Sequence, residues 1–279
     1  MGSAFSEACG LAAHPATDFW GRRQMIRGFL LAVQFFTAVP VRKNLPIGRK
    51  ETIWMFTLYP LVGAMIGAVS WSAAALASGP GGTGPFLTAF ILVLLSAVLS
   101  GGLHLDGWAD MGDAYFSYRE RDKRLEIMGD PRIGAFGTMA LLFLILGKLA
   151  VLEDLISRGG LLPAFVVFVP FAARAGLAIY LAVSMQAKRS GLLVFFIEKL
   201  EGFPLALPAA VLLASGGAAA AVWSGSLLFP LLAAVAVPAA VLFFRNWSAR
   251  NFGGATGDLA GAFIEGCELL LWTILLFCI

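Results

Sequence analysis

Long apolar runs dominate this sequence and leave few folds open to it. Seven of them lie at about 52–78, 86–103, 134–156, 161–183, 203–223, 227–244 and 259–279. Each is long enough to cross about 30 Å of hydrocarbon at about 1.5 Å of helix rise per residue. Hydrophobic residues make up 59% of the chain and charged residues 13%, against about 45–50% and about 25% in soluble domains. We therefore predict an all-α, polytopic integral membrane bundle of about seven transmembrane helices and exclude a water-soluble globule.

A shorter apolar stretch precedes these runs. It covers residues 28–41, about 14 residues, and follows Arg22, Arg23 and Arg27. A helix of this length does not span a bilayer. We predict an interfacial or re-entrant helix there, an N-terminal cytoplasmic tail over residues 1–27, and a single membrane-embedded domain over residues 28–279.

Basic residues concentrate in alternate loops. Segments 1–51, 104–133, 184–202 and 245–258 hold seventeen of the twenty Lys and Arg. The positive-inside rule places this face and the N-terminus in the cytoplasm, and seven spans would put the C-terminus outside. The formal net charge of +3 provides no concentrated basic face, so nucleic acid is not expected as a partner.

Three aspartates follow the second predicted span at helical spacing. Asp106, Asp110 and Asp113 stand at i, i+4 and i+7, so on a helix they fall within about 60° of one another. Carboxylates this close repel unless a cation lies among them, and Mg²⁺ takes one or two carboxylates together with substrate phosphates. A solvated loop with scattered acids is the alternative. His104 would point nearly the opposite way, and serves as a general base only if the glycines break the helix.

A run of mixed charges comes directly downstream, over residues 119–134. On its own such a run is usually a solvated face. Beside three carboxylates it gains a second interpretation, because a divalent ion and several arginines together bind a diphosphate. The candidate residues are Arg119, Arg124, Glu126, Asp130 and Arg132. The third span opens at this point, and its free backbone N–H groups are also candidates to face an anion.

Ionisable residues also lie inside the predicted spans, where their default interpretation is function or a buried pair. Asp258 can cap the last span, and Glu265 lies seven residues further on the same face. Arg174 is either a structural partner of Glu265 or a phosphate ligand. For Lys148 we favour snorkelling to the interface or a pair with Glu153.

Four ordered motifs resemble those of the cobalamin synthase family, the adenosylcobinamide-GDP ribazoletransferases. They cover Gln34 to Pro40, Leu103 to Asp113, Arg119 to Gly134 and Gly253 to Ala262, and the similarity runs in order from about residue 28 to the end. The resemblance implies a multi-pass, Mg²⁺-dependent enzyme of the bacterial inner membrane. It would join adenosylcobinamide-GDP to α-ribazole or its 5′-phosphate and release GMP during assembly of the nucleotide loop of vitamin B12.

The resemblance also implies roles for individual residues. Asp106, Asp110 and Asp113 would be catalytic and would hold the metal, with Asp258 as a further ligand, one carboxylate as the base, and His104 as another catalytic candidate. The substrate-binding candidates are Arg119, Arg124, Glu126, Asp130, Arg132, Arg174, Thr256 and Glu265. The chain departs from the family pattern at Ala114, where a glycine is common, and at Gln186 and Lys188, where the family motif begins Tyr-Ala-Arg.

Other membrane enzymes and a transporter are the alternatives. CDP-alcohol phosphotransferases also use a membrane aspartate cluster, but their motif places Arg where this chain has Asp110; prenyltransferases need two Asp-rich motifs of another form. A transporter would use the intramembrane charges as a pathway. Besides the substrates and the bilayer, a homo-oligomer and upstream corrinoid-pathway enzymes are possible partners.

Overall fold

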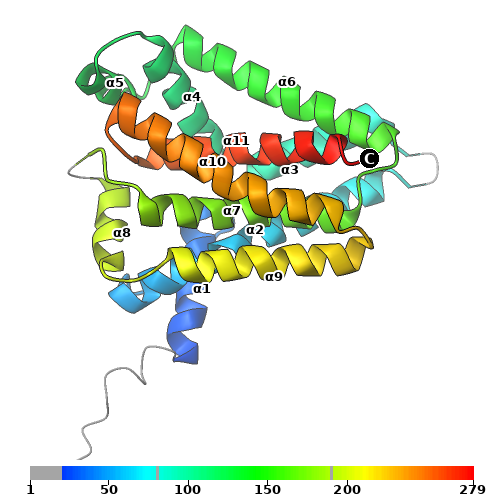
Figure 1. Cartoon of the computed structure of the whole chain (residues 1–279), viewed down its shortest axis with the longest axis horizontal. Coiled ribbons are helices and arrows are strands. Elements are labelled where there is room, and N and C mark those ends of the chain that lie inside the picture. Colours follow the sequence, from blue (N-terminus) through cyan, green and yellow to red (C-terminus); the bar gives the residue numbers. More distant parts are fainter. Residues whose placement is uncertain (1–20, 80–81, 189–190) are drawn as a thin grey trace, which may run out of the picture.

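The computed structural model describes residues 21–79, 82–188 and 191–279, and every regular element in those ranges is a helix. Six helices in these ranges are long and apolar enough to cross a membrane. They are α2 (Arg49–Ala77), α6 (Ala135–Ser157), α7 (Pro163–Val183), α9 (Ala206–Ser224), α10 (Leu228–Phe252) and α11 (Gly257–Leu276). They form one bundle, and their shared direction is clear in Figure 1. The all-α, polytopic membrane fold is confirmed.

The second predicted span is shorter than its apolar run. Helix α3 (Pro85–Leu99) has 15 residues, about 22 Å at about 1.5 Å per residue, and α4 (Leu103–Phe116) leaves it at 91°. Gly101 and Gly102 make this bend with φ of 65° and 73°, values that glycine adopts at little cost. Within the described residues the bundle therefore has six candidate spans, or seven if α3 and α4 count as one bent span.

The N-terminal helix begins earlier than the apolar stretch suggests. Helix α1 covers Arg22–Phe36, so it includes the end of the predicted tail and stops before residue 41. It packs on α2 through Gly28, where an added Cβ would meet Trp54 and the backbone at Glu51. Residues 1–20, the rest of the predicted tail, lie outside the described ranges.

Helix α7 is the centre of the bundle. Most of its side chains are buried, and it packs against α2, α9, α10 and α11. Two glycines of α2 permit close approach: a Cβ on Gly63 would strike the carbonyl oxygen of Pro170, and one on Gly67 that of Val166. Small residues at such crossings let membrane helices pack tightly without a hydrophobic driving force.

The polar elements gather at one end of the bundle. The short helices α5 (Arg121–Ile127) and α8 (Leu192–Leu200) lie at this end together with α4, whereas the C-terminus lies at the other (Figure 1). Both short helices fall within the loops that are rich in Lys and Arg. The candidate residues of the acidic helix and of the charged run are thus placed at the same end.

Candidate functional site

The acidic segment forms helix α4, so its three aspartates share one face as predicted. Asp106 is exposed, while Asp110 and Asp113 are half-buried. The helix lies directly on α11 and α6, because Gly107 touches the backbone of Asp258 and Gly112 touches Ala140. This close packing brings carboxylates from α4 and α11, far apart in the sequence, to one place.

Asp113 has a structural partner that the sequence did not reveal. Its carboxylate accepts hydrogen bonds from the backbone N–H groups of Gly134 (2.6 Å) and Gly137 (2.8 Å), at the start of α6. The N–H groups that we expected to face a bound anion therefore face Asp113. Each carboxylate oxygen keeps acceptor capacity for a further partner.

Asp258 lies in the first turn of α11, at the same end of the bundle. Thr256, rather than Asp258, caps this helix, since its hydroxyl accepts from the N–H of Leu259 at 3.1 Å. Asp258 faces Lys188, with 3.9 Å between Oδ2 and Nζ. Asp110 experiences the charges of Asp106, Asp258 and Asp113, and the opposing charge of Lys188.

These carboxylates do not form a closed metal cage. Across the three described ranges, no group of three or more His, Cys, Asp or Glu side chains is arranged to hold a metal ion. What the structure provides is an open row of oxygen donors. The row has one nearby lysine as its counter-charge.

A cleft of about 320 Å³ opens beside these carboxylates, between α1, α2, α4, α7, α8 and α11. Asp106, Lys188, Gln186, Thr256 and Asp258 line its polar part. The remaining lining is mainly apolar and aromatic: Phe36, Phe56, Tyr59, Leu103, Leu177, Leu181, Leu192, Leu193, Val194, Phe196, Ala260 and Ile264. Sequence reasoning could not find this cleft, because its walls come from α1, α2, α4, α7, α8 and α11, which meet only after folding.

His104 lies on the buried side of α4. Its Nε2 atom is 2.8 Å from the Tyr59 hydroxyl, and its side chain lines the cleft. Helix α4 continues through Gly107, so the break that would turn His104 toward the aspartates is absent. The geometry gives no support to His104 as the general base, and Tyr59 is a partner that the sequence analysis missed.

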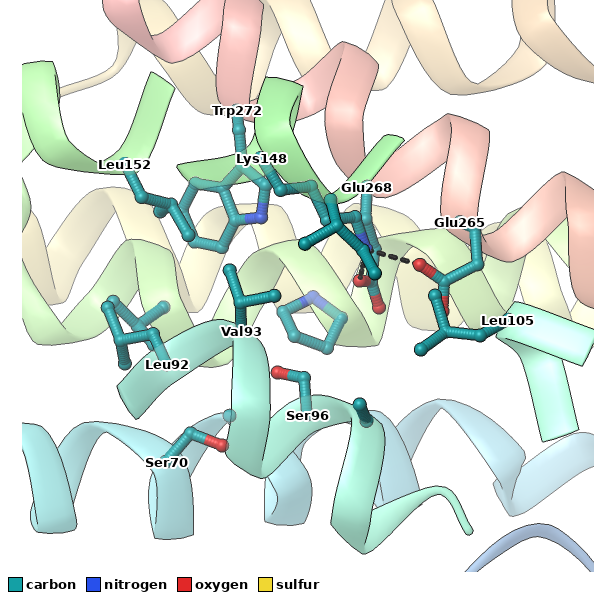
Figure 2. Close-up of a pocket in the computed structure, with 15 residues that line it drawn as sticks. Ser70, Leu92, Val93, Ser96, Leu105, Lys148, Leu152, Glu265, Glu268 and Trp272 are labelled. Carbon is teal, nitrogen blue, oxygen red and sulfur yellow. Dashed lines mark hydrogen bonds and ion pairs between the residues drawn. The ribbon is translucent and has the colours of Figure 1, made fainter. Parts of the chain in front are cut away.

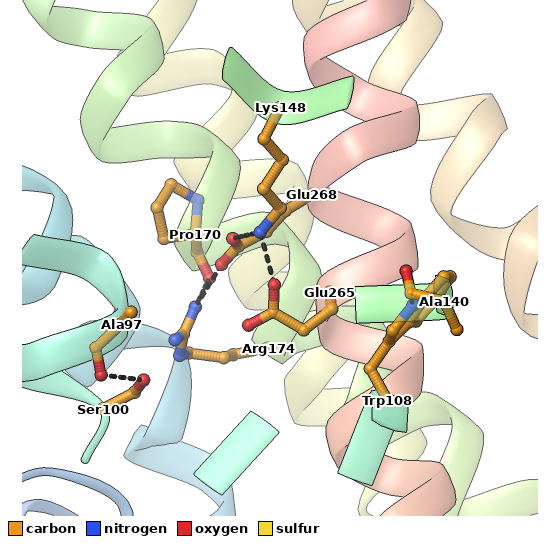
Figure 3. A network of polar contacts seen from close by, with 9 residues as sticks. All are labelled: Ala97, Ser100, Trp108, Ala140, Lys148, Pro170, Arg174, Glu265 and Glu268. Atoms are coloured by element: carbon orange, nitrogen blue, oxygen red, sulfur yellow. Dashed lines mark hydrogen bonds and ion pairs between the residues drawn. The ribbon is translucent and has the colours of Figure 1, made fainter. Parts of the chain in front are cut away.

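A buried ion network joins α6, α7 and α11. Lys148 Nζ lies 2.6 Å from Glu265 and 2.8 Å from Glu268, and Arg174 lies 2.9 Å from Glu268 (Figure 3). Arg174 also donates to the Pro170 carbonyl at 2.9 Å. All four ionic side chains are at most 7% exposed, and the two cations balance the two anions.

This network corrects three predictions. Lys148 neither snorkels nor pairs with Glu153, whose carboxylate accepts instead from Ser157. Arg174 pairs with Glu268, which we had not singled out, and not with Glu265. Both Arg174 and Glu265 are committed to buried partners, so neither is placed to bind substrate.

The network borders only a small cavity. Its volume is about 30 Å³, and Lys148, Glu265 and Glu268 line it together with Ser70 and Ser96 (Figure 2). This is about the space that one water molecule takes in the liquid. The cavity is far too small for a substrate, unlike the cleft beside the carboxylates.

The predicted phosphate ligands lie on and around α5. Arg132 holds Asp130 through two hydrogen bonds of 2.9 and 2.7 Å, and this pairing lowers the pKa of Asp130 to about 2. Arg124 donates to Asn251 at 2.8 Å and lies over the ring of Tyr115. Glu126 pairs with Lys123 at 2.8 Å rather than with an arginine, and Arg119 is exposed.

Fold and site together define a polytopic membrane protein with a carboxylate row beside a part-apolar cleft. The sequence profile of the cobalamin-5-phosphate synthase family matches residues 28–276. The chain belongs to this family and is a transferase of cobalamin biosynthesis. No solved structure matches it.

Curated relatives of this family align with the chain over nearly their whole lengths. An adenosylcobinamide-GDP ribazoletransferase of Geobacillus thermodenitrificans is 38% identical, over 90% of this chain and 96% of the relative. Proteins with the same name from Pseudomonas aeruginosa and Clostridium tetani are 36% and 30% identical, and the alignments again span 96% of each relative. The family match favours this transferase family over the CDP-alcohol phosphotransferases and over a transporter.

Proposed function

We propose that this protein joins adenosylcobinamide-GDP to α-ribazole or α-ribazole 5′-phosphate and releases GMP. A ribose hydroxyl oxygen forms a bond to the phosphorus that carries the cobinamide. The bond from that phosphorus to the bridging oxygen breaks, and GMP leaves with the electron pair. The hydroxyl proton passes to a base. Such a displacement depends mainly on positioning and on neutralising charge around the diphosphate.

One observation carries this proposal: carboxylates of α4 and α11 converge at the polar part of the cleft. Asp106 and Asp258 line it, and Asp110 is close enough to interact electrostatically with both of these carboxylates. Asp106 is the most exposed of the three aspartates of α4 and is our candidate for the base. A carboxylate that contacts both solvent and the cleft can accept the proton and release it to water.

The donor set fits Mg²⁺. This ion prefers oxygen ligands, keeps several waters, and usually takes one or two carboxylates plus substrate phosphates. Asp110 and Asp258 would hold it, which leaves Asp106 as the base, and Asp113 is a further donor that already accepts two N–H bonds. The ion supplies charge neutralisation on the diphosphate.

Basic residues at the same end would bind the phosphates. Lys188 lies at the cleft itself, and Arg119, Arg124 and Arg132 lie on the elements that follow α4. Asp130 orients the Arg132 guanidinium through a two-bond pair. Because these groups are in the loops rich in Lys and Arg, we place the site on the cytoplasmic face and the protein in the bacterial inner membrane. A homo-oligomer and contacts with upstream enzymes stay predictions.

Purified protein in lipid nanodiscs tests the activity directly. Given adenosylcobinamide-GDP, α-ribazole and Mg²⁺, it should release GMP and form the joined corrinoid in equal amounts. Movement of a corrinoid across sealed vesicles without GMP release would instead indicate transport and contradict the proposal.

A further inference from the structure

The cleft beside the carboxylates is divided between a polar part and an apolar part. On α11, Asp258 belongs to the polar part and Ile264 to the apolar part, six residues or about 9 Å further along the helix. On the opposite wall, Leu177 and Leu181 lie inside α7, while Gln186 follows its end. A ligand that fills the cleft therefore needs one polar and one apolar end.

The apolar part is shaped by aromatic rings. The Phe36 and Tyr59 ring centroids are 4.4 Å apart, and those of Phe56 and Phe196 are 5.9 Å apart. Its polar groups are the Tyr59 hydroxyl and His104, which bond to each other at 2.8 Å. A base that enters here finds apolar surface and few free hydrogen-bonding groups.

Gln186, in the polar part of the cleft, has an unusual lack of partners for its side chain. Its side-chain Nε2 and Oε1 atoms are both buried, and neither has a hydrogen-bond partner among the described residues. Its backbone is fixed by bonds between Ala187 and Ala255 (3.0 Å) and between Ala255 and Met185 (2.7 Å). A buried amide without partners is costly, and a bound ligand is a common reason for one.

We propose that this cleft is the subsite for the nucleoside acceptor, an inference that rests on the proposed function. The flat benzimidazole-type base lies among Phe56, Tyr59, Phe196, Leu177 and Ile264. The ribose lies against Gln186, whose amide holds the ribose hydroxyl that does not react. This arrangement directs the neighbouring ribose hydroxyl toward Asp106 and Asp258, where the diphosphate is held.

The other two parts of the substrates fit this cleft poorly. A volume of about 320 Å³ is at the low end of ligand pockets, about 300–1,000 Å³, and a corrin ring with its side chains exceeds it. Guanine carries several donors and acceptors on its edges, which the apolar part would leave unpaired. The corrinoid and the guanosine therefore stay outside the apolar part.

Two substitutions test the subsite in different ways. Leu177→Trp fills the apolar part, and Gln186→Leu removes the amide at similar volume. Leu231→Trp, at a 62% exposed position of α10, is the matched control for adding an indole. Binding of α-ribazole alone is measured by titration calorimetry, and the KM of each substrate is measured from GMP release.

We expect Leu177→Trp to raise the Kd and KM for α-ribazole at least tenfold, with the KM for adenosylcobinamide-GDP changed less than twofold. The effect should be smaller for a nucleoside of unsubstituted benzimidazole, which is narrower. Gln186→Leu should raise the acceptor KM about three- to tenfold, the effect of one or two lost hydrogen bonds. Leu231→Trp should match the unchanged protein.

An unchanged Kd for α-ribazole in both folded variants would overturn the subsite, as would a rise in the KM of adenosylcobinamide-GDP alone. Folding is checked by gel filtration and thermal unfolding. If the indole of Leu177→Trp disrupts α7, Gln186→Leu alone tests the subsite. GMP release by the unchanged protein tests the proposed function separately. The binding of α-ribazole alone requires no turnover, so it tests the subsite even if GMP release fails. Failure of the subsite is therefore distinguishable from failure of the proposed function.

Discussion

At the scale of single residues, the aspartates of α4 differ in what they already contact. Spacing alone predicts their common face, but it does not show that Asp113 caps α6. We expect Asp106→Asn to reduce GMP release at least about 100-fold, the lower range for loss of a general base, with little change in thermal unfolding. Asp113→Asn should instead lower the free energy of unfolding by about 1 kcal/mol, because a charged cap is lost. If Asp106→Asn and Asp113→Asn reduced GMP release equally and lowered the free energy of unfolding equally, the separate roles of the two aspartates would be contradicted.

Asp130 gives a residue-scale prediction about pH. The Arg132 guanidinium holds the pKa of Asp130 at about 2, below its ordinary value. A lowered pKa means that the pair stabilises above the unfolded-state value and is lost only as pH falls toward 2. We therefore expect Asp130 to stay ionised from about pH 5 to 9, and Asp130→Asn to leave the shape of the pH–rate profile unchanged over that range. If the unchanged protein showed an inflection in that range that Asp130→Asn lacks, Asp130 would titrate during turnover and the prediction would be wrong.

At the scale of elements, the contact between α4 and α11 sets the distance between their carboxylates. Gly107 lies against the backbone of Asp258, with no room for a Cβ. Gly107→Ala should push the two helices apart and reduce GMP release at least about tenfold, since small misplacements in a catalytic site are costly. Gly84→Ala, at a position with open space, is the control. Equal activity of the two variants would show that the helix spacing does not matter.

The buried network is also an element-scale feature, because it ties α6 and α7 to α11. Lys148→Met leaves Glu265 and Glu268 with Arg174 alone, and we expect a loss of about 3 kcal/mol or more in unfolding free energy. Adding Glu265→Gln should recover part of this loss in thermal unfolding, since one unpaired charge is removed. Lys123→Met, on the surface, should have little effect. No recovery in the double variant would contradict the pairing.

At the scale of the whole molecule, hydropathy predicts six of the spans to within a few residues, apart from the longer C-terminal end of α10. It misses the bend after Leu99, because residues 100–103 carry no charge that would end the run, while the direction is set by Gly101 and Gly102. The pairing of Lys148 and the walls of the cleft depend on which helices become neighbours, which periodicity within one helix does not encode. The site was therefore predictable where its residues share α4, and not where residues of α4, α7, α8 and α11 line one cleft.

The topology itself is open to a labelling test. Ser117, after α4, and Ser226, between α9 and α10, lie in loops at opposite ends of the bundle. With the native cysteines replaced, we expect Ser117→Cys to react with an impermeant thiol reagent only in inside-out vesicles, and Ser226→Cys only in right-side-out spheroplasts. The reverse pattern would place the carboxylate row on the outer face.

The central claim is that carboxylates of α4 and α11 act together on one ion at the cleft. Its most direct test is the Mg²⁺ dependence of GMP release by the unchanged protein, Asp110→Asn and Asp258→Asn in nanodiscs. We predict that a chelator abolishes release, that Mg²⁺ restores it, and that each variant needs at least about tenfold more Mg²⁺ or stays inactive. Release that persists in chelator, or an unchanged Mg²⁺ requirement in both variants, would contradict the claim.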